Sequence, residues 1–189
     1  MNKLVVLVIV LIFTTIGCRN KKEILYYFEQ SNPVIIKLGR KHNKIFRVNI
    51  PVGLTVSNKS ISKKSFITID YKYSPYKKGI GEDIYKYSDG KSIKIKNNEE
   101  KIISSYSSNK YIIYSRYRLD STKVTQDQFK PYIEKMLSEN KDTLHIGTVT
   151  EFKQKHKVLF EKLTKNDSIS IQFLDGKKLG ERITVPVEW

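Results

Sequence analysis

Short alternating runs of hydrophobic and polar residues predict β-strands along most of the chain. In residues 45–56, Phe46, Val48, Ile50, Val52 and Leu54 occupy every second position, which is the spacing of a strand with one buried face. Similar patterns rich in β-branched and aromatic residues predict strands at 24–28, 34–38, 66–73 and 111–119. Pro51 lies inside the longest run, and because proline lacks an N–H it predicts a sheet edge or a break there.

Two Asp-Gly pairs predict the turns of two β-hairpins. Asp89-Gly90 joins residues 83–88 to 91–96, and Asp175-Gly176 begins a turn over 175–178 between runs at 169–173 and 183–187. Both residue types tolerate the positive φ that tight hairpin turns require. The register of the first hairpin places Ile84, Ile93 and Ile95 on one face and Tyr85, Tyr87, Ser92 and Lys94 on the other. In the second hairpin, Pro186 predicts an edge strand.

Helical spacing of apolar residues is found only late in the chain. Phe129, Tyr132, Ile133, Met136 and Leu137 follow the i, i+3, i+4 spacing of one helix face. Asp127 is the predicted N-cap, because it places Pro131 in the first turn, where a missing N–H costs little. A cap at Thr125 would place Pro131 deeper in the helix.

A capping box predicts a second helix after a short strand at 143–146. Thr148 and Glu151 have the spacing at which each side chain caps the other's backbone N–H. The apolar face of this helix would carry Phe152, Leu159 and Leu163, with His156 and Phe160 beside them.

These elements predict an α+β fold with about eight strands and two late amphipathic helices. Strands and helices do not alternate as βαβ units, so we expect a mainly antiparallel sheet or sandwich on which the helices pack. Residues 74–81 and 97–109 read as loops. No repeat or composition shift divides the chain, so residues 24–189 are expected to form one globular domain.

The first 18 residues have the layout of a bacterial export signal. Lys3 precedes the apolar residues 4–13, and small or polar residues follow up to Cys18. The apolar stretch, counted through Ile16, has 13 positions, whereas a membrane-spanning helix needs about 20. A permanent membrane span is therefore the weaker interpretation.

Ile16-Gly17-Cys18 resembles the lipobox of bacterial lipoproteins, although Thr15 stands where leucine is usual. The resemblance implies that residues 1–17 are cleaved as a signal peptide and that Cys18 carries a diacylglyceryl group, often with a further acyl chain such as palmitate. Residues 18–23 would then be a lipidated tether, and its acyl chains would hold the protein on a membrane. In the alternative, Cys18 has no role. Because Cys18 is the only cysteine, the exported chain would then carry a free thiol.

The residues after Cys18 indicate to which membrane the protein would be attached. Arg19-Asn20-Lys21-Lys22 contains neither the aspartate that signals inner-membrane retention in lipoproteins nor the acidic cluster that marks surface export in some groups. The resemblance therefore favours the periplasmic face of the outer membrane in a Gram-negative envelope. In a Gram-positive envelope, the protein would face outward from the single membrane.

Basic charge is the main feature of the expected domain. The formal net charge is +16, and only Lys3 of the leader contributes to it. Tyrosines interleave with the basic residues, and the candidate surface for an anionic ligand consists of Tyr85, Tyr87, Lys86, Lys94, Arg116 and Arg118. Exported proteins seldom meet nucleic acid, so an acidic protein, an anionic lipid or a glycan is the expected partner. Alternatively, AT-rich coding explains the many lysines, since the chain contains no alanine.

No catalytic, metal-binding or cofactor-binding motif is recognisable. His42, His145 and His156 lie at no ligand spacing, and the acidic pairs Glu82-Asp83 and Glu99-Glu100 are merely adjacent in sequence. We therefore expect no metal, no cofactor and a non-enzymatic binding, accessory or structural module of the cell envelope. The alternatives are an immunity-type lipoprotein that neutralises a toxin and a hydrolase that acts on envelope glycan or lipid.

Overall fold

The computed structural model describes residues 23–74 and 79–189. The expected signal peptide, Cys18 and most of the tether lie outside the described residues, as do residues 75–78 of a predicted loop. The strands are β1 (Ile24–Glu29), β2 (Pro33–Gly39), β3 (Lys44–Asn58), β4 (Lys64–Lys72), β5 (Gly79–Ser88), β6 (Lys91–Lys94), β7 (Lys101–Ile103), β8 (Ser108–Arg118), β9 (Thr143–Thr148), β10 (Ser168–Asp175) and β11 (Lys178–Pro186). The helices are α2 (Lys123–Asp127), α3 (Lys130–Ser138), α4 (Val149–Lys155) and α5 (Lys157–Thr164).

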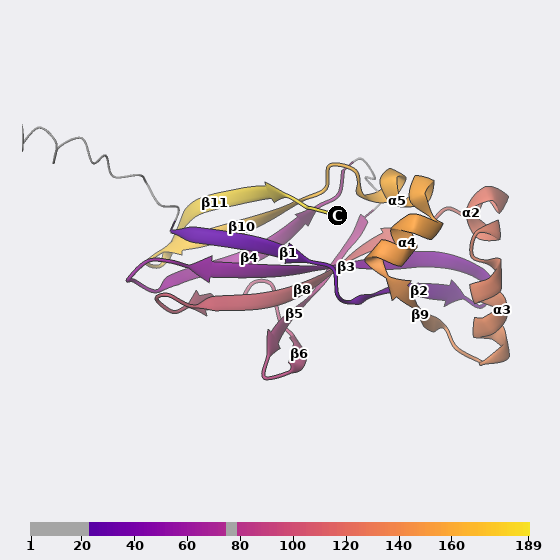
Figure 1. The fold of residues 1–189 in the computed structure, drawn as a ribbon, viewed down its shortest axis with the longest axis horizontal. Helices are drawn as coiled ribbons and strands as arrows, with labels where there is room; N and C mark the ends of the chain where they lie inside the picture. Colours follow the sequence, from indigo (N-terminus) through magenta and orange to yellow (C-terminus); the bar gives the residue numbers. More distant parts are fainter. Residues whose placement is uncertain (1–22, 75–78) are drawn as a thin grey trace, which may run out of the picture.

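The architecture confirms a mainly antiparallel α+β fold. Seven strands form a large sheet in the order β6-β5-β8-β3-β2-β9, with β1 also paired to β3, and four strands form a small sheet in the order β11-β10-β4-β7. Figure 1 shows the small sheet facing one half of the large sheet, while the helices lie at the other end. The molecule is therefore a sandwich at one end and a helix-covered sheet at the other.

β3 is the long central strand of the large sheet. It pairs with β8 along residues 47–57 on one side. β2 and β1 share its other side, β2 along residues 44–49 and β1 along residues 53–58. Pro51 lies between these two partners and opposite Tyr114 of β8. The prediction of an edge or a break at Pro51 is therefore wrong for β3 itself. On the side of β3 that β2 and β1 share, residues 50–52 have no partner strand. The N–H that Pro51 lacks is therefore not missed in a ladder on that side.

The alternation predicted for residues 45–56 holds from Val48 onward and fails at Phe46. Val48, Ile50, Val52, Leu54 and Val56 are fully buried, whereas Phe46 is 44% exposed. The pairing with β2 jumps from Arg47 to Ile45, so one extra residue bulges out of β3 at this point. Ile45 takes the inward position instead of Phe46.

Both predicted hairpins are confirmed in position and register. Ser88 pairs with Lys91 around Asp89-Gly90, and Asp175 pairs with Lys178 in the second hairpin. Pro186 lies in β11, which is an edge strand as predicted. β5 begins at Gly79, earlier than the sequence pattern indicates, so part of the predicted loop 74–81 is strand.

The predicted loop 97–109 contains a strand that the pattern does not reveal. β7 pairs with β4, and Lys101 and Ile103 are both buried. Three residues are too few to show an alternating pattern. With β7, the described residues form eleven strands instead of the predicted eight or so.

The helical part begins differently from the prediction. Asp127 is the last residue of α2, and the N-cap of α3 is Phe129, which has no side-chain capping bond. Thr122 caps α2 instead, through its side chain and the backbone N–H of Thr125. Pro131 does lie in the first turn of α3. The Asp127 prediction fails because the chain is already helical there, so the side chain is not at a free helix start.

The capping box of the second predicted helix is confirmed at Thr148 and Glu151. The predicted helix is nevertheless two helices, α4 and α5, separated at His156 with φ −126°. Its predicted apolar residues Phe152, Leu159, Phe160 and Leu163 are all buried. They join the inward residues of both sheets in one continuous hydrophobic core.

Candidate functional site

The predicted anionic-ligand residues do not all lie on one face of the large sheet. In antiparallel sheets, directly paired residues point to the same side. Tyr85 pairs with Lys94 and with Ile112 on one face, whereas Lys86 pairs with the fully buried Tyr111 and therefore lies on the core side. Alternation along β8 places Arg116 and Arg118 on the face of Tyr85. We call this the outer face, because the small sheet and the helices cover the opposite side.

The basic residues near Tyr85 are partly neutralised by one carboxylate. Asp83 forms ion pairs with Lys94 at 2.7 Å and with Arg116 at 3.7 Å. The hydrogen bond from Lys94 to Asp83 raises the pKa of the lysine. Arg116 Nε also donates to the carbonyl of Gly81 at 3.2 Å. Lys94 and Arg116 are therefore positioned by their own chain, which lowers their availability to an anionic ligand.

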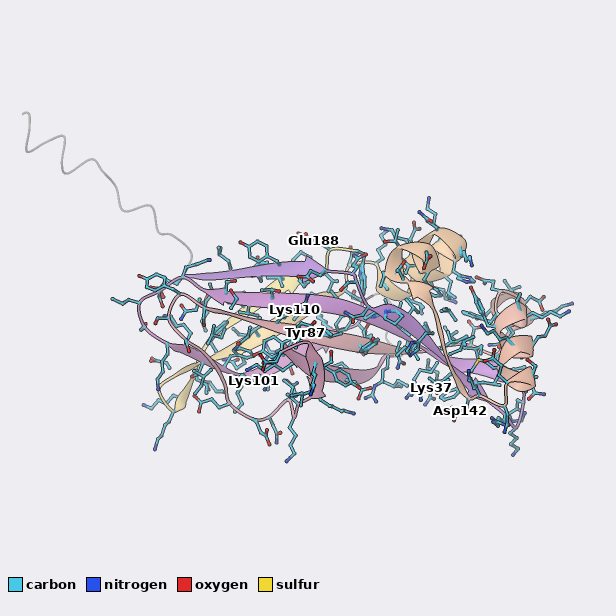
Figure 2. The ribbon with its side chains drawn as sticks, turned by 60° about the horizontal axis from the view of Figure 1, so that its bottom comes forward. Lys37, Tyr87, Lys101, Lys110, Asp142 and Glu188 are labelled. Atoms are coloured by element: carbon cyan, nitrogen blue, oxygen red, sulfur yellow. The ribbon has the colours of Figure 1, made fainter. Side chains whose placement is uncertain are left out.

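Aromatic rings occupy the same part of the outer face. Tyr85 and Tyr114 meet edge to face, with ring centroids 6.0 Å apart. The Nζ of Lys110 lies 5.4 Å from the Tyr87 ring and pairs with Glu29 at 2.5 Å. Figure 2 labels Tyr87 and Lys110 near the middle of this face. These contacts hold Tyr85, Tyr87 and Tyr114 as packed side chains. Of these three, Tyr87 is the most exposed, at 41%.

A basic row, of which only Arg118 was predicted from the sequence, crosses the outer face at the other end. Arg47 of β3 pairs directly with Arg118 of β8 and with Lys37 of β2, so three cations lie opposite one another on neighbouring strands. Directly opposed like charges are unfavourable in a sheet. Figure 2 labels Lys37 at the end near the helices. We name Lys37, Arg47 and Arg118 the basic row; the alternation in β2 and β3 could have revealed it, had the strand order been known.

Two polar atoms beside the basic row are buried without hydrogen-bond partners among the described residues. They are Nε of Arg47, a donor, and Oδ1 of Asn49, an acceptor, two residues apart on the same face of β3. Buried polar atoms are nearly always satisfied in folded proteins. Both atoms lie beneath the surface, so they mark a buried polar stretch of β3 under the basic row and are not themselves open to a ligand.

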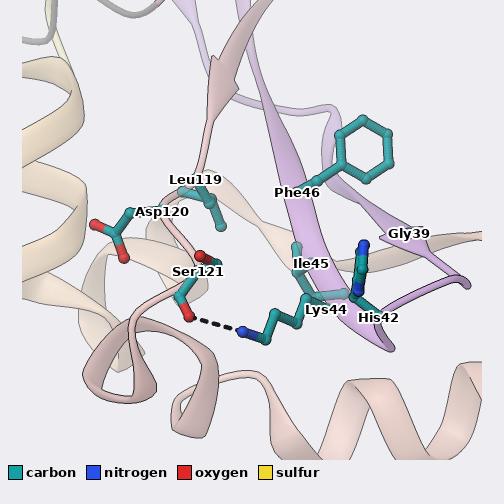
Figure 3. Close-up of a pocket in the computed structure, with 8 residues that line it drawn as sticks. All are labelled: Gly39, His42, Lys44, Ile45, Phe46, Leu119, Asp120 and Ser121. Atoms are coloured by element: carbon teal, nitrogen blue, oxygen red, sulfur yellow. Dashed lines mark hydrogen bonds between the residues drawn. The ribbon is translucent and has the colours of Figure 1, made fainter.

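A hollow of about 310 Å³ lies next to the basic row, between the β2–β3 turn and the end of β8. Its lining includes His42, Asp120 and Ser121, the residue types of a hydrolase triad. Figure 3 shows His42 and Asp120 on opposite sides of the hollow, and the dashed bond joins Lys44 Nζ to the Ser121 carbonyl at 3.0 Å. Asp120 instead accepts hydrogen bonds from Thr122 and Lys162, and the hydroxyl bonds hold its pKa well below the usual range. The geometry is not that of a nucleophile, base and orienting acid.

Asp167 is an acid buried between the two sheets, and it is 1% exposed. Its carboxylate accepts hydrogen bonds from the hydroxyls of Tyr71 at 2.8 Å and Tyr117 at 2.5 Å, and from the backbone N–H of Ser74. Burial raises the pKa of Asp167 to about 6. Because β4, β8 and the turn after α5 meet here inside the core, the arrangement joins the two sheets and is not a ligand site.

The histidines form no metal centre in the described part of the chain. His42 lies in the β2–β3 turn, His145 is exposed on β9, and His156 is buried against the aromatic residues of α3 and α4. Within residues 23–74 and 79–189, no three His, Cys, Asp or Glu side chains gather as a metal site would require. None of the helices in the same ranges is long and apolar enough to cross a bilayer.

Comparison of the chain with protein-family models, curated proteins and solved structures finds no match.

Proposed function

We propose that this protein is a lipid-anchored lipoprotein of the bacterial cell envelope and that its β-domain is a non-enzymatic module that binds an acidic partner. The observation that carries the proposal is the leader ending in Ile16-Gly17-Cys18, which stands five residues before Glu23, the first residue that the structure describes. Lipid on Cys18 would keep the domain next to a membrane. A toxin-neutralising lipoprotein is one form that such a module takes.

The geometry of the polar groups favours binding over catalysis. In the hollow lined by His42, Asp120 and Ser121, Asp120 is hydrogen-bonded to Thr122 and Lys162 and lies away from His42. On the outer face, Asp83 and Glu29 are each paired with lysine. Glu82 lies near Asp70 and Asp83, and burial followed by the charge of Asp70 raises its pKa, but Arg182 pairs with Asp70 and Lys94 pairs with Asp83. This pairing of the acids with cations favours binding over hydrolysis.

The basic row supports an acidic protein as the partner. Guanidinium groups present several N–H donors in a planar fork that matches a carboxylate. Arg47 of β3 and Arg118 of β8 lie directly opposite each other on the outer face. An acidic side chain that lies across the two strands would be attracted by both guanidinium groups.

The anchor is tested by intact-mass analysis and by labelling with a clickable palmitate analogue. The native protein should begin at Cys18 and carry acyl chains, whereas Cys18→Ser should lose the label and keep residues 1–17. Removal of the leader at the same bond in Cys18→Ser, or a bare thiol in the native protein, would contradict the proposal.

The binding face is tested with the detergent-solubilised native protein and poly-L-glutamate as the acidic probe. Arg47→Gln with Arg118→Gln should weaken binding about tenfold, roughly one charged hydrogen bond. The matched control, Lys155→Gln with Lys157→Gln, removes the same charge from the helical end. Equal losses in the two double variants would show that net charge alone governs binding, and the basic row would not be the site.

A further inference from the structure

Three loops of the sandwich converge where the folded chain begins. The backbone N–H of Lys59, after β3, donates to the Glu23 carbonyl at 2.7 Å, and Asn58 donates to Ser107 of the β7–β8 turn at 2.9 Å. The β10–β11 turn lies at the same end, because Leu174 pairs with Ser65 near the start of β4. We call this the entry end: Glu23, the loops 59–63 and 104–107, and the tip of the β10–β11 hairpin (175–179), in which Leu179 is the second residue of β11. Figure 1 shows it opposite the helices along the longest axis of the molecule.

Each loop of the entry end exposes one large apolar side chain. Ile61 is 83% exposed, Tyr106 is 70% exposed and Leu179 is 71% exposed. Single exposed apolar residues are common on soluble proteins. Here three of them lie on three separate connections between strands, all at the end where the described chain begins at Glu23.

The backbone at Tyr106 is a second observation. Tyr106 has φ +51°, a conformation that bulky residues rarely adopt. The other non-glycine residues with positive φ in the described ranges are all Asn or Asp, namely Asn43, Asp89, Asn140 and Asn166. Asn or Gly would fit this turn without strain. A tyrosine held there, facing solvent, indicates that its ring is needed outside the fold.

Lysines flank two of these apolar residues. Lys59 and Lys63 flank Ile61, while Lys177 and Lys178 precede Leu179, and all four are exposed. Lys64 is paired with Glu23 at 2.6 Å. Apolar residues at the ends of loops with lysines beside them are the arrangement that enters the headgroup region of an anionic bilayer.

We infer that the entry end docks on the surface of an anionic phospholipid bilayer, with Ile61, Tyr106 and Leu179 entering the interface and the neighbouring lysines contacting headgroup phosphates. The inference rests on the proposed function, because lipid on Cys18 directs this end toward the membrane. The five residues from Cys18 to Glu23 span at most about 17 Å when fully extended, so the anchored domain cannot move far from the bilayer. Docking holds the helices at the far end, away from the lipid.

Single introduced cysteines test this contact in the full lipidated protein. Cys18 is the only cysteine, and in the proposed lipoprotein its sulfur is blocked by the thioether to diacylglycerol, so a polarity-sensitive fluorophore attaches only at the new site. Ile61→Cys and Leu179→Cys are compared with Val158→Cys on α5, which is also 83% exposed. The proteins are reconstituted into vesicles of phosphatidylethanolamine and phosphatidylglycerol that contain a nitroxide-labelled lipid as quencher.

The labels at positions 61 and 179 should shift to the blue and be quenched by the nitroxide lipid, whereas the label at 158 should behave as in water. Lys177→Gln with Lys178→Gln should lower the ratio of inserted to free entry end about fivefold per charge removed. The same ratio should fall in vesicles of phosphatidylcholine alone. Circular dichroism checks that each variant remains folded.

The failures of the two proposals are distinguishable. If the native protein proves to carry no acyl chain, the proposed function fails. If the protein is acylated and bound to vesicles but the labels at 61 and 179 remain in water, or match the label at 158, the inference about the entry end is overturned and the anchor stands.

Discussion

The hydroxyl of Tyr117 donates a hydrogen bond of 2.5 Å to the carboxylate of Asp167 and so connects the large sheet to the turn after α5. The hydroxyl of Tyr71 in the small sheet donates to the same oxygen at 2.8 Å. Three elements far apart in the sequence therefore meet at one buried acid. Whether that acid is protonated or ionised should therefore change the free energy of unfolding of the whole domain.

Stability should fall as pH rises through the titration of Asp167. Its pKa is raised from 3.8 to about 6 by burial, so between these values the folded state holds a proton that the unfolded state releases. The stabilisation is complete below about pH 4 and is lost by about pH 6, by up to about 3 kcal/mol. Asp167→Asn should remove this dependence in urea unfolding at pH 4.5, 5.5 and 7. Asp175→Asn, in an exposed turn, is the control; parallel curves for Asp167→Asn and wild type would refute the assignment.

His156 should give the opposite dependence. Its ring stacks on Phe129 at 5.2 Å, its Nε2 is buried without a partner among the described residues, and burial, followed by Lys155, lowers its pKa. Below about pH 6.5, His156 binds a proton more readily in the unfolded chain than in the folded state, so the free energy of unfolding falls with falling pH. His156→Phe keeps the ring packing and should flatten the loss between pH 7 and pH 5.5 in chemical unfolding. His42→Gln, on an exposed turn, should leave that loss unchanged; a His156→Phe curve as steep as wild type would contradict the explanation.

Lys101 should be more important for stability than any exposed lysine. It is 8% exposed, and its Nζ donates to the carbonyls of Ile67, Asn97 and Glu99 at 2.7–2.9 Å. Lys101→Met keeps the stem and leaves three carbonyls without this donor, so the free energy of unfolding should fall by about 3 kcal/mol. Lys96→Met, on the exposed side of the same loop, should change it by less than about 0.5 kcal/mol. Equal midpoints in urea for the two variants would show that water replaces the ammonium group at no cost.

The capping box of α4 provides a test of local helix stability. Thr148 accepts from the backbone N–H of Glu151, and Glu151 accepts from the backbone N–H of Thr148 at 2.7 Å. Thr148→Ala should lower the free energy of unfolding by about 1 kcal/mol. Thr150→Ala, an exposed position in the same turn, is the matched control. A loss at position 150 as large as that at 148 would attribute the effect to threonine packing rather than to the cap.

Local chemistry explains which parts of the fold could be predicted from the sequence. Asp89-Gly90 and the Thr148–Glu151 box act within four residues, so their signals are complete in the sequence and both were confirmed. Asp127 and Pro51 failed for the opposite reason, because their meaning depends on neighbours. A helix already runs through Asp127, and two strands meet end to end beside Pro51.

The candidate sites required strand order as well as strand position. Tyr85, Lys94, Arg116 and Arg118 share a face because β5, β6 and β8 are neighbours. Lys86 is excluded by its register with Tyr111. The basic row depends on β2 lying next to β3, and the Asp167 cluster depends on the contact between sheets. No spacing within one segment contains that information.

The sharing of β3 by β1 and β2 affects how the molecule would bear a mechanical load. A pull on the chain at Glu23, directed away from the domain, acts along the axis of β1. Since β1 runs antiparallel to β3 with six consecutive residue pairs, the force loads their hydrogen bonds together in shear and does not peel them apart singly. The load then passes into a strand of fifteen residues, about 50 Å long, that extends to the helical end. Traction at the N-terminus would therefore be distributed over the central sheet instead of detaching its first strand.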